Sequence, residues 1–273
     1  MKTKVTGSEV LDNGAGRVKL TMEPSKGGDS KEEEFDVVLV STGRRPFTEG
    51  MGLEEMGIEM DKMGRVVVDD HFRSNIPSIF AIGDVIDGPM LAHKAEEEGI
   101  AAVEFIKGLG GHVNYDAIPG VIYTFPEVAT VGKTEEQLKE EGKVVHFFGL
   151  LYELDLQLTY LGGFPLFFFY SVLFSQTGTP YNKGTFPMQA NSRARTVRQA
   201  DGIVKILSHK ETDQVLGVHI VGSNAGEMIM EGVIAIEYGA SSEDIARTCH
   251  AHPTLSEAFK EAAMATYDKP IHF

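Results

Sequence analysis

The chain has 273 residues, of which 42% are hydrophobic and 24% are charged, as in a globular protein rather than a disordered one. Its net charge of −15 argues against nucleic acid as a partner, since non-specific binding to phosphates depends on Lys and Arg. The single cysteine, Cys249, excludes an internal disulfide, a dithiol redox pair and a multi-cysteine zinc site within one chain. Residues 1–9 are polar, so we expect no targeting segment there.

Two short apolar runs near the amino terminus predict α/β architecture. Residues 35–40 and 78–82 are rich in β-branched and apolar side chains, and each run ends at a turn that contains glycine. This pattern is typical of buried strands whose carboxyl ends face a ligand crevice. Before them, residues 16–22 alternate like a half-buried strand, and the acidic run 23–34 is interpreted as a solvated turn region.

A helix is expected from Met90 to Ile106. Its apolar residues recur near a 3.6-residue period, and Glu96, Glu97 and Glu98 are assigned to its solvent face. Glycines from Gly108 onward end the pattern.

Beyond Pro119 the pattern changes to that of an antiparallel sheet with helices on one side, an α+β arrangement. A helix is predicted over 225–238, and a last helix with Pro253 in its first turn, where proline is accepted. The expected strands are 121–124, 128–131, 202–207 and 215–221.

One segment, about 144–179, does not fit this arrangement. It is rich in phenylalanine, and no charged residue occurs from Leu156 to Asn182. A membrane span over Leu158 to Phe174 is slightly short of the ~20 apolar residues required and contains glycine and proline, so a membrane is the less favoured partner. A buried hairpin and a segment foreign to the fold are the other interpretations.

The strongest chemical constellation is the run 250–257. A helix that begins at Pro253 would leave His252 at its amino end, with Glu257 one turn further on. A carboxylate that hydrogen-bonds an imidazole fixes its tautomer and raises its basicity, as a general base requires. A capping or packing role for His252 remains open, and a metal site at His250 and His252 is disfavoured because no further ligands accompany them.

A second constellation surrounds Asp84. An aspartate just after a strand can accept hydrogen bonds from sugar or polyol hydroxyls, and the helix behind it directs unpaired N–H groups to the same place. The alternative is an aspartate in a tight turn before a helix cap. Gly43 permits close backbone approach to a ligand, although Arg44 and Arg45 could be solvated surface charges. No complete G-x-G-x-x-G fingerprint is present.

Taken together, these motifs resemble the carboxyl-terminal half of the dihydrolipoamide dehydrogenases, a branch of the flavin-dependent, class I pyridine nucleotide-disulfide oxidoreductases. Glutathione and mercuric reductases share the Gly-Asp and His-Pro-Thr elements, whereas 88–93 and 250–257 are more similar to the lipoamide branch. The matching stretches are 41–47, 81–96, 121–124, 190–194 and 250–257.

The resemblance implies FAD and NAD as cofactors and oxidation of dihydrolipoamide as the activity. Asp84, next to Gly83, would bind the ribityl chain of the flavin, and Gly43 would lie near NAD. His252, oriented by Glu257, would act as base toward the partner subunit's flavin and disulfide, so the implied assembly is a homodimer. The residues implied to contact the flavin are Met90, Leu91, Ala92 and His93.

The resemblance also implies three parts. Residues 1–43 would be the last part of an NAD-binding domain, 44–118 a returning segment of a Rossmann-like FAD-binding domain, and 119–273 an α+β interface domain interrupted at 144–179. The flavin fingerprint and redox disulfide of the family are absent from this sequence. We therefore expect a truncated chain, inactive alone, whose Phe-rich segment is translated non-coding sequence.

Other functions remain open at this point. The chain could be a non-catalytic dimerisation fragment, a membrane-tethered fragment, or part of another flavin disulfide reductase. The implied partners of the leading interpretation are the lipoyl domains of 2-oxoacid dehydrogenase complexes, and the implied compartment is the mitochondrial matrix.

Overall fold

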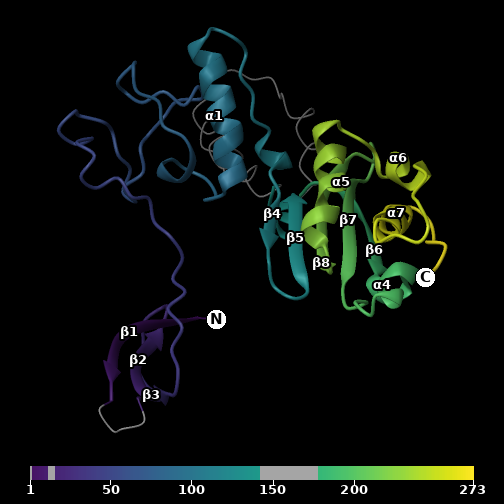
Figure 1. Ribbon diagram of the computed structural model, residues 1–273, viewed down its shortest axis with the longest axis horizontal. Helices are drawn as coiled ribbons and strands as arrows, with labels where there is room; N and C mark the ends of the chain where they lie inside the picture. Colours follow the sequence, from purple (N-terminus) through teal and green to yellow (C-terminus); the bar gives the residue numbers. More distant parts are fainter. Residues whose placement is uncertain (1, 12–15, 142–177) are drawn as a thin grey trace, which may run out of the picture.

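The computed structural model describes residues 2–11, 16–141 and 178–273. The amino-terminal part is a three-stranded antiparallel sheet of order β1-β2-β3, built from β1 (Thr3–Val10), β2 (Val18–Pro24) and β3 (Lys31–Phe35). Figure 1 shows this sheet apart from the other elements, joined to them by one extended stretch of chain. The predicted strand at 16–22 is confirmed as β2.

The predicted strand over 35–40 is wrong, because residues 36–40 are not in a strand. The acidic run before them was interpreted as a turn, yet it contains the start of β3. A strand needs a neighbour for its backbone hydrogen bonds, and no strand pairs with 36–40 in the part of the chain described. Val37, Leu39 and Val40 are consequently 79–85% exposed.

The second predicted strand, 78–82, is also wrong. It is reduced to an isolated bridge between Arg73 and Phe80. Turns dominate residues 49–91, and carboxylates hold several of them: Asp61 accepts the backbone N–H groups of Met63 and Arg65 at 2.8 and 2.9 Å. These turns enclose a small core of Ile58, Val66, Phe72, Ile86, Ala101 and Ala102.

The expected helix is confirmed as α1 (Ala92–Ile106), and the chain turns after it through Gly108, whose φ is +73°. The assignment of Glu98 to the solvent face is wrong. Its side chain is fully buried and forms an ion pair with the equally buried Lys94. The aliphatic side chains of Ile100, Val103 and Ile106 are 58–59% exposed instead.

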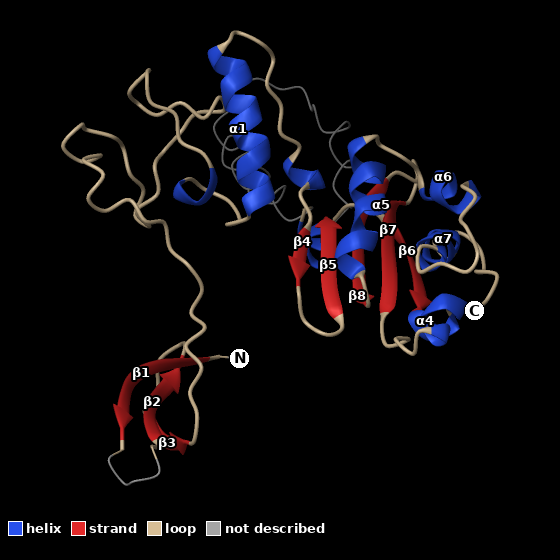
Figure 2. Cartoon of the chain, in the orientation of Figure 1, coloured by secondary structure: helices blue, strands red, loops and turns tan. Residues whose placement is uncertain are grey.

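The carboxyl-terminal part contains a five-stranded sheet of order β4-β5-β8-β7-β6, in which every neighbouring pair is antiparallel (Figure 2). We call residues 119–141 and 178–273 the interface domain. The α+β prediction is confirmed. The strands are β4 (Gly120–Ile122), β5 (Glu127–Gly132), β6 (Tyr181–Pro187), β7 (Ile203–His209) and β8 (Val215–Gly222).

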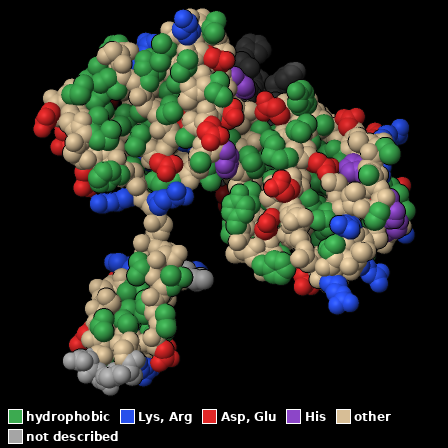
Figure 3. Space-filling view, in the orientation of Figure 1, with side chains coloured by type: hydrophobic (Ala, Val, Ile, Leu, Met, Phe, Trp, Pro, Cys, Tyr) green, Lys and Arg blue, Asp and Glu red, His purple; other side chains and the backbone are tan. Residues whose placement is uncertain are grey.

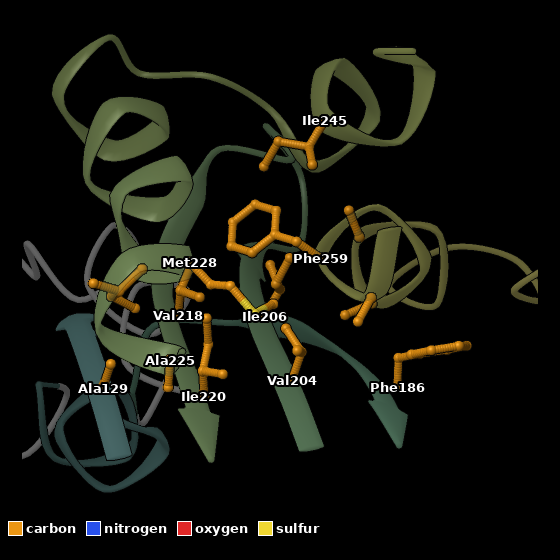
Figure 4. Packing of buried hydrophobic residues seen from close by; sticks show 14 of the residues in the cluster. Ala129, Phe186, Val204, Ile206, Val218, Ile220, Ala225, Met228, Ile245 and Phe259 are labelled. Carbon is orange, nitrogen blue, oxygen red and sulfur yellow. The ribbon is translucent and has the colours of Figure 1, made fainter. Parts of the chain in front are cut away.

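Helices α5 (Ala225–Glu237) and α7 (Glu257–Met264) pack on one face of this sheet, α5 against β5 and β8, and α7 against β6 and β7. Strand alternation sends one set of apolar side chains into the space beneath them. In Figure 4, labelled side chains from the strands point toward those from the helices, with Phe259 of α7 among them. The core members of the strands are Ala129, Val131, Phe186, Val204, Ile206, Val215, Val218 and Ile220.

Shorter helices complete the domain and have recognisable start signals. A capping box of Thr134 and Gln137 opens α2 (Glu135–Glu140), and one of Ser241 and Asp244 opens α6 (Ser242–Arg247). Asn191 caps α4 (Ser192–Thr196). Of the single-turn 3-10 helices described, η3 (Met188–Ala190) lies in this domain, whereas η1 (Gly83–Val85) and η2 (Tyr115–Ala117) precede it.

Glu141 and Gly178 border the segment 142–177, which lies outside the described residues and includes most of the Phe-rich segment and the candidate membrane span. These two borders lie next to each other: the Thr179 N–H donates to the Leu138 carbonyl at 2.8 Å, and the Thr179 hydroxyl contacts Glu141. Within the described ranges, no helix has the length and apolar character to span a membrane.

The last helix does not include Pro253 as predicted. It begins at Glu257, and Pro253 follows a cis peptide bond in the preceding turn. Side chains hold this turn in place: Asn191 donates its Nδ2 to the Thr254 carbonyl at 2.9 Å, and the Thr254 hydroxyl donates to the Ala251 carbonyl at 2.7 Å.

Candidate functional site

His252 and Glu257 form a hydrogen-bonded pair at the amino end of α7. The imidazole Nδ1 lies 2.8 Å from Oε1 of Glu257, and Oε2 of Glu257 accepts the Thr254 N–H at 2.8 Å. The His252 side chain is 63% exposed, and within the described residues its Nε2 contacts no partner. A carboxylate therefore fixes one ring nitrogen while the other is open to a substrate.

His250 lies two residues away in a different environment. Its Nε2 lies 3.0 Å from Glu231 and its Nδ1 lies 3.0 Å from the Thr248 carbonyl. The side chain is only 8% exposed, so His250 serves packing and has no free ring nitrogen. Among the residues that the structure describes, no group of three or more His, Cys, Asp and Glu side chains could hold a metal ion.

The environment of Glu257 keeps this carboxyl group ionised. Burial raises its pKa, but the Thr254 N–H and the His252 imidazole more than offset this, and the net pKa lies below the ordinary value. A charged Glu257 stabilises the imidazolium that forms when His252 accepts a proton. The pair can thus perform general base chemistry.

The Gly83–Asp84 turn lies at the other candidate site, against α1. Gly83 has φ of +71°, and an added Cβ there would lie 2.9 Å from the Cβ of Ala95. Only glycine allows the turn to approach the helix this closely. The Asp84 side chain is 46% exposed and can accept hydrogen bonds from a ligand.

The residues after this turn lead into the amino end of α1. Met90 and Leu91 are half-buried, while Ala92 and His93 are exposed. Leu91 makes no side-chain cap, so first-turn N–H groups of α1 are available near Asp84. His93 is held by its Nε2, 2.7 Å from the Pro119 carbonyl. A carboxylate beside uncapped N–H groups suits a ligand with hydroxyls and electron-rich atoms, as FAD has.

Arg44 contacts the same turn, a role that the sequence interpretation missed. Its Nη2 donates to the Met90 carbonyl at 3.3 Å, and its Nη1 lies 4.0 Å from Oδ2 of Asp84. The neighbouring Gly43 has φ of +83° and open space around it. Its predicted place beside NAD stays a prediction. The only sequence signal for this contact is the Gly43-Arg44-Arg45 run. The Arg44 side chain is 72% exposed, as a solvated surface charge would also be.

The two groups of residues lie apart in one chain. Figure 1 shows α1 beyond the β4 edge of the five-stranded sheet and α7 near its β6 edge, with α5 between them. The structure therefore does not bring His252 to Asp84 within a single chain. A site that uses both groups requires two chains.

Comparison with known families identifies the class. Residues 1–99 match the family described as pyridine nucleotide-disulphide oxidoreductase, and residues 118–151 and 174–263 match its dimerisation domain. The chain belongs to the pyridine nucleotide-disulphide oxidoreductase family. The second match leaves out residues 152–173, inside the Phe-rich segment.

Within that family the chain is similar to the carboxyl-terminal part of dihydrolipoyl dehydrogenases, which confirms the resemblance found in the sequence. It is 56% identical over 272 residues to the mitochondrial dihydrolipoyl dehydrogenase 1 of Arabidopsis thaliana and 54% identical over 272 residues to the mitochondrial enzyme of Pisum sativum. Both comparisons cover 100% of this chain and 46% of the relative, so the chain spans about half of their length.

Solved structures support the fold. The crystal structure of LpdA from Mycobacterium tuberculosis matches 96% of this chain and 48% of its own with a TM-score of 0.70. The sequence identity of 24% restricts this likeness to architecture.

Proposed function

We propose that this chain is the acid-base and dimerisation portion of a dihydrolipoyl dehydrogenase, which oxidises dihydrolipoamide to lipoamide with FAD and NAD. The observation that carries the proposal is the His252–Glu257 pair, with Nδ1 fixed and Nε2 open, in a chain 56% identical to such an enzyme. Oxidation of a dithiol to a disulfide releases two electrons and two protons. NAD takes up both electrons together with one proton, as a hydride, and the second proton is released, so a base must accept protons from the thiols.

His252 supplies that base. Its exposed Nε2 accepts a thiol proton, and Glu257 stabilises the resulting positive charge through Nδ1. When bound, FAD carries the electron pair between the thiols and NAD. Asp84 would hold hydroxyls of this cofactor, while Met90, Leu91, Ala92 and His93 would line its ring system and Gly43 would lie near NAD.

Each active site would use two chains in a homodimer, since His252 and Asp84 lie apart in one. The redox cysteines must also come from elsewhere, because Cys249 is the only cysteine present. We therefore expect the isolated chain to be inactive. The lipoyl domains of 2-oxoacid dehydrogenase complexes would be its partners, and the mitochondrial names of the relatives support the mitochondrial matrix as its compartment.

Complementation in mixed dimers tests the proposal. The histidine of the Arabidopsis relative that aligns with His252 is replaced by glutamine, and this chain is added to supply His252 in trans. We expect NAD reduction by dihydrolipoamide to return with the parent chain and with the Cys249→Ser control, but not with His252→Gln. Equal recovery with His252→Gln, or no recovery with any chain, would contradict the proposal.

A difference in burial between two parts of the chain favours a second function, that of a non-catalytic dimerisation fragment. The interface domain has a continuous core, whereas Val37, Leu39 and Val40 are exposed. Co-purification with the relative in the absence of restored activity would support this function.

A further inference from the structure

We propose that Glu98, Lys94 and Tyr115 are positioning residues that fix the Gly83–Asp84 turn and connect its geometry to the interface domain. The proposal deepens the proposed function and rests on it for the flavin role of this turn. None of the three side chains is assigned to contact the cofactor or substrate. They act through the backbone of Gly83.

Glu98 is the centre of this network. Its Oε2 accepts the Gly83 N–H at 2.7 Å, while its Oε1 lies 2.9 Å from Nζ of Lys94 and accepts the Tyr115 hydroxyl at 2.8 Å. The side chain is fully buried, and both of its oxygens are engaged by donors. The carboxylate therefore holds one orientation and presents Oε2 to the turn.

Lys94 holds the same turn from a second direction. Its Nζ donates to the Gly83 carbonyl at 3.3 Å, so one ion pair satisfies both backbone groups of this residue. Its aliphatic stem lies close to Gly88, where an added Cβ would be 2.8 Å from Cε of Lys94. Both glycine turns that flank Asp84 thus rest on a single buried lysine.

Tyr115 brings the network to the interface domain. It opens η2, which packs against α5 and β5, and the preceding Asn114 donates its Nδ2 to Glu237 of α5 at 2.9 Å. Burial and the hydrogen bond to Glu98 raise the pKa of the Tyr115 phenol, which keeps it a donor at neutral pH. A displacement of η2 would therefore reach Gly83 through two hydrogen bonds.

The energetics favour a role in orientation over one in stability. A buried ion pair loses the hydration of two charges, and apolar replacements of such pairs are often neutral or stabilising. An apolar pair would offer no hydrogen-bond acceptor for the Gly83 N–H and no donor for the Gly83 carbonyl, so it could not fix the orientation of this peptide. That directional property is what a cofactor turn requires.

Amide exchange of Gly83, followed by NMR in the full chain without flavin, tests the proposal. Tyr115→Phe removes one hydroxyl and frees Glu98 on one side, so we expect Gly83 to exchange about tenfold faster. The control is Tyr181→Phe, which removes a similar hydrogen bond, of 3.0 Å, to Glu135 of α2. It should leave Gly83 unchanged, and Ile220 in the sheet core should exchange alike in all variants.

Glu98→Gln and Lys94→Met extend the test. The glutamine keeps the shape but turns one acceptor into a donor facing Lys94 and Tyr115, so faster exchange than in Tyr115→Phe is expected. Adding Lys94→Met removes that conflict and should slow Gly83 exchange again, which a loss of general stability would not produce. Unchanged Gly83 exchange in Tyr115→Phe, or acceleration shared equally by Ile220, would overturn the proposal. Because no flavin is present, failure here is distinct from failure of the complementation experiment.

Discussion

At the scale of single residues, the two neighbouring histidines show how surroundings decide chemistry. His250 has both ring nitrogens engaged and is buried, whereas His252 has one nitrogen fixed and the other open. The sequence predicted the Glu257 partner of His252 from spacing alone. It could not predict Glu231 as the partner of His250, because that contact joins residues 19 positions apart.

Glu257 gives a prediction about pH. Its pKa is lowered in the folded chain, so its contribution to stability is present above the ordinary glutamate pKa and is lost as pH falls through the lowered value. Glu257→Gln should therefore reduce the free energy of unfolding by about 1–3 kcal/mol at pH 7 and by less near pH 3. Urea unfolding at both pH values measures this.

The exposed Glu97, changed to Gln, is the control for a general charge effect. A loss for Glu257→Gln that is the same at both pH values would contradict the assignment.

At the scale of elements, the sequence predicted what local pattern determines and missed what distant partners determine. The helix α1 and the strands β2, β7 and β8 were found because periodicity is a local signal. The strands expected at 35–40 and 78–82 did not form, since a strand depends on a neighbour. The burial of Glu98 was missed because it depends on partners that only the folded chain brings to the carboxylate. These partners are the Gly83 N–H, the Lys94 ammonium and the Tyr115 hydroxyl.

The candidate site was predicted to a similar extent. Motif spacing predicted His252, Glu257 and Asp84 as site residues; the structure shows the His252–Glu257 contact, and the roles of the three residues stay predictions. Arg44 and Tyr115 were missed, because their contacts with Met90 and Glu98 arise only when the chain folds back. Pro253 was placed in the helix because proline favours first turns, but side-chain contacts hold it in a separate turn.

The border of segment 142–177 gives a prediction at this scale. Since Glu141 and Gly178 lie next to each other, deleting the segment and joining its borders through two glycines should preserve the five-stranded sheet. We expect a melting temperature within a few degrees of the parent and a single cooperative transition. A control deletion of Lys210 to Asp213, the β7–β8 turn, should unfold the domain. Loss of the cooperative transition on deleting 142–177 would contradict this.

At the scale of the whole molecule, the interface domain and the part around α1 differ in how fully their apolar side chains are buried. The interface domain buries a continuous core between its sheet and helices. The part around α1 exposes many apolar groups, and in Figure 3 hydrophobic side chains are frequent on its surface. Exposed apolar surface of this extent indicates a region that is covered in an assembly.

The connection between the amino-terminal sheet and the remainder predicts the first site of proteolysis. Residues 36–48 lie outside regular structure, and Leu39 and Phe47 are 85% and 71% exposed. On the variant lacking 142–177, chymotrypsin should cut first at these residues and leave a stable fragment that contains α1 and the interface domain. Mass spectrometry identifies the cut. A first cut within β5–β8 would contradict the assignment of stability to that sheet, and Leu39→Lys with Phe47→Lys should slow the reaction.

The adjacent borders of segment 142–177 also make this point of the fold a suitable place to carry additional sequence. Because the borders Glu141 and Gly178 lie next to each other, and doubling the length of a flexible loop costs only about 0.6 kcal/mol of closure entropy, we expect flexible insertions at this point to change the stability of the domain little. An error of RNA processing that added in-frame residues here would leave a protein still able to fold its dimer surface. By the same reasoning, a fluorescent protein placed between these two residues should leave the five-stranded sheet folded and make the chain visible in living cells.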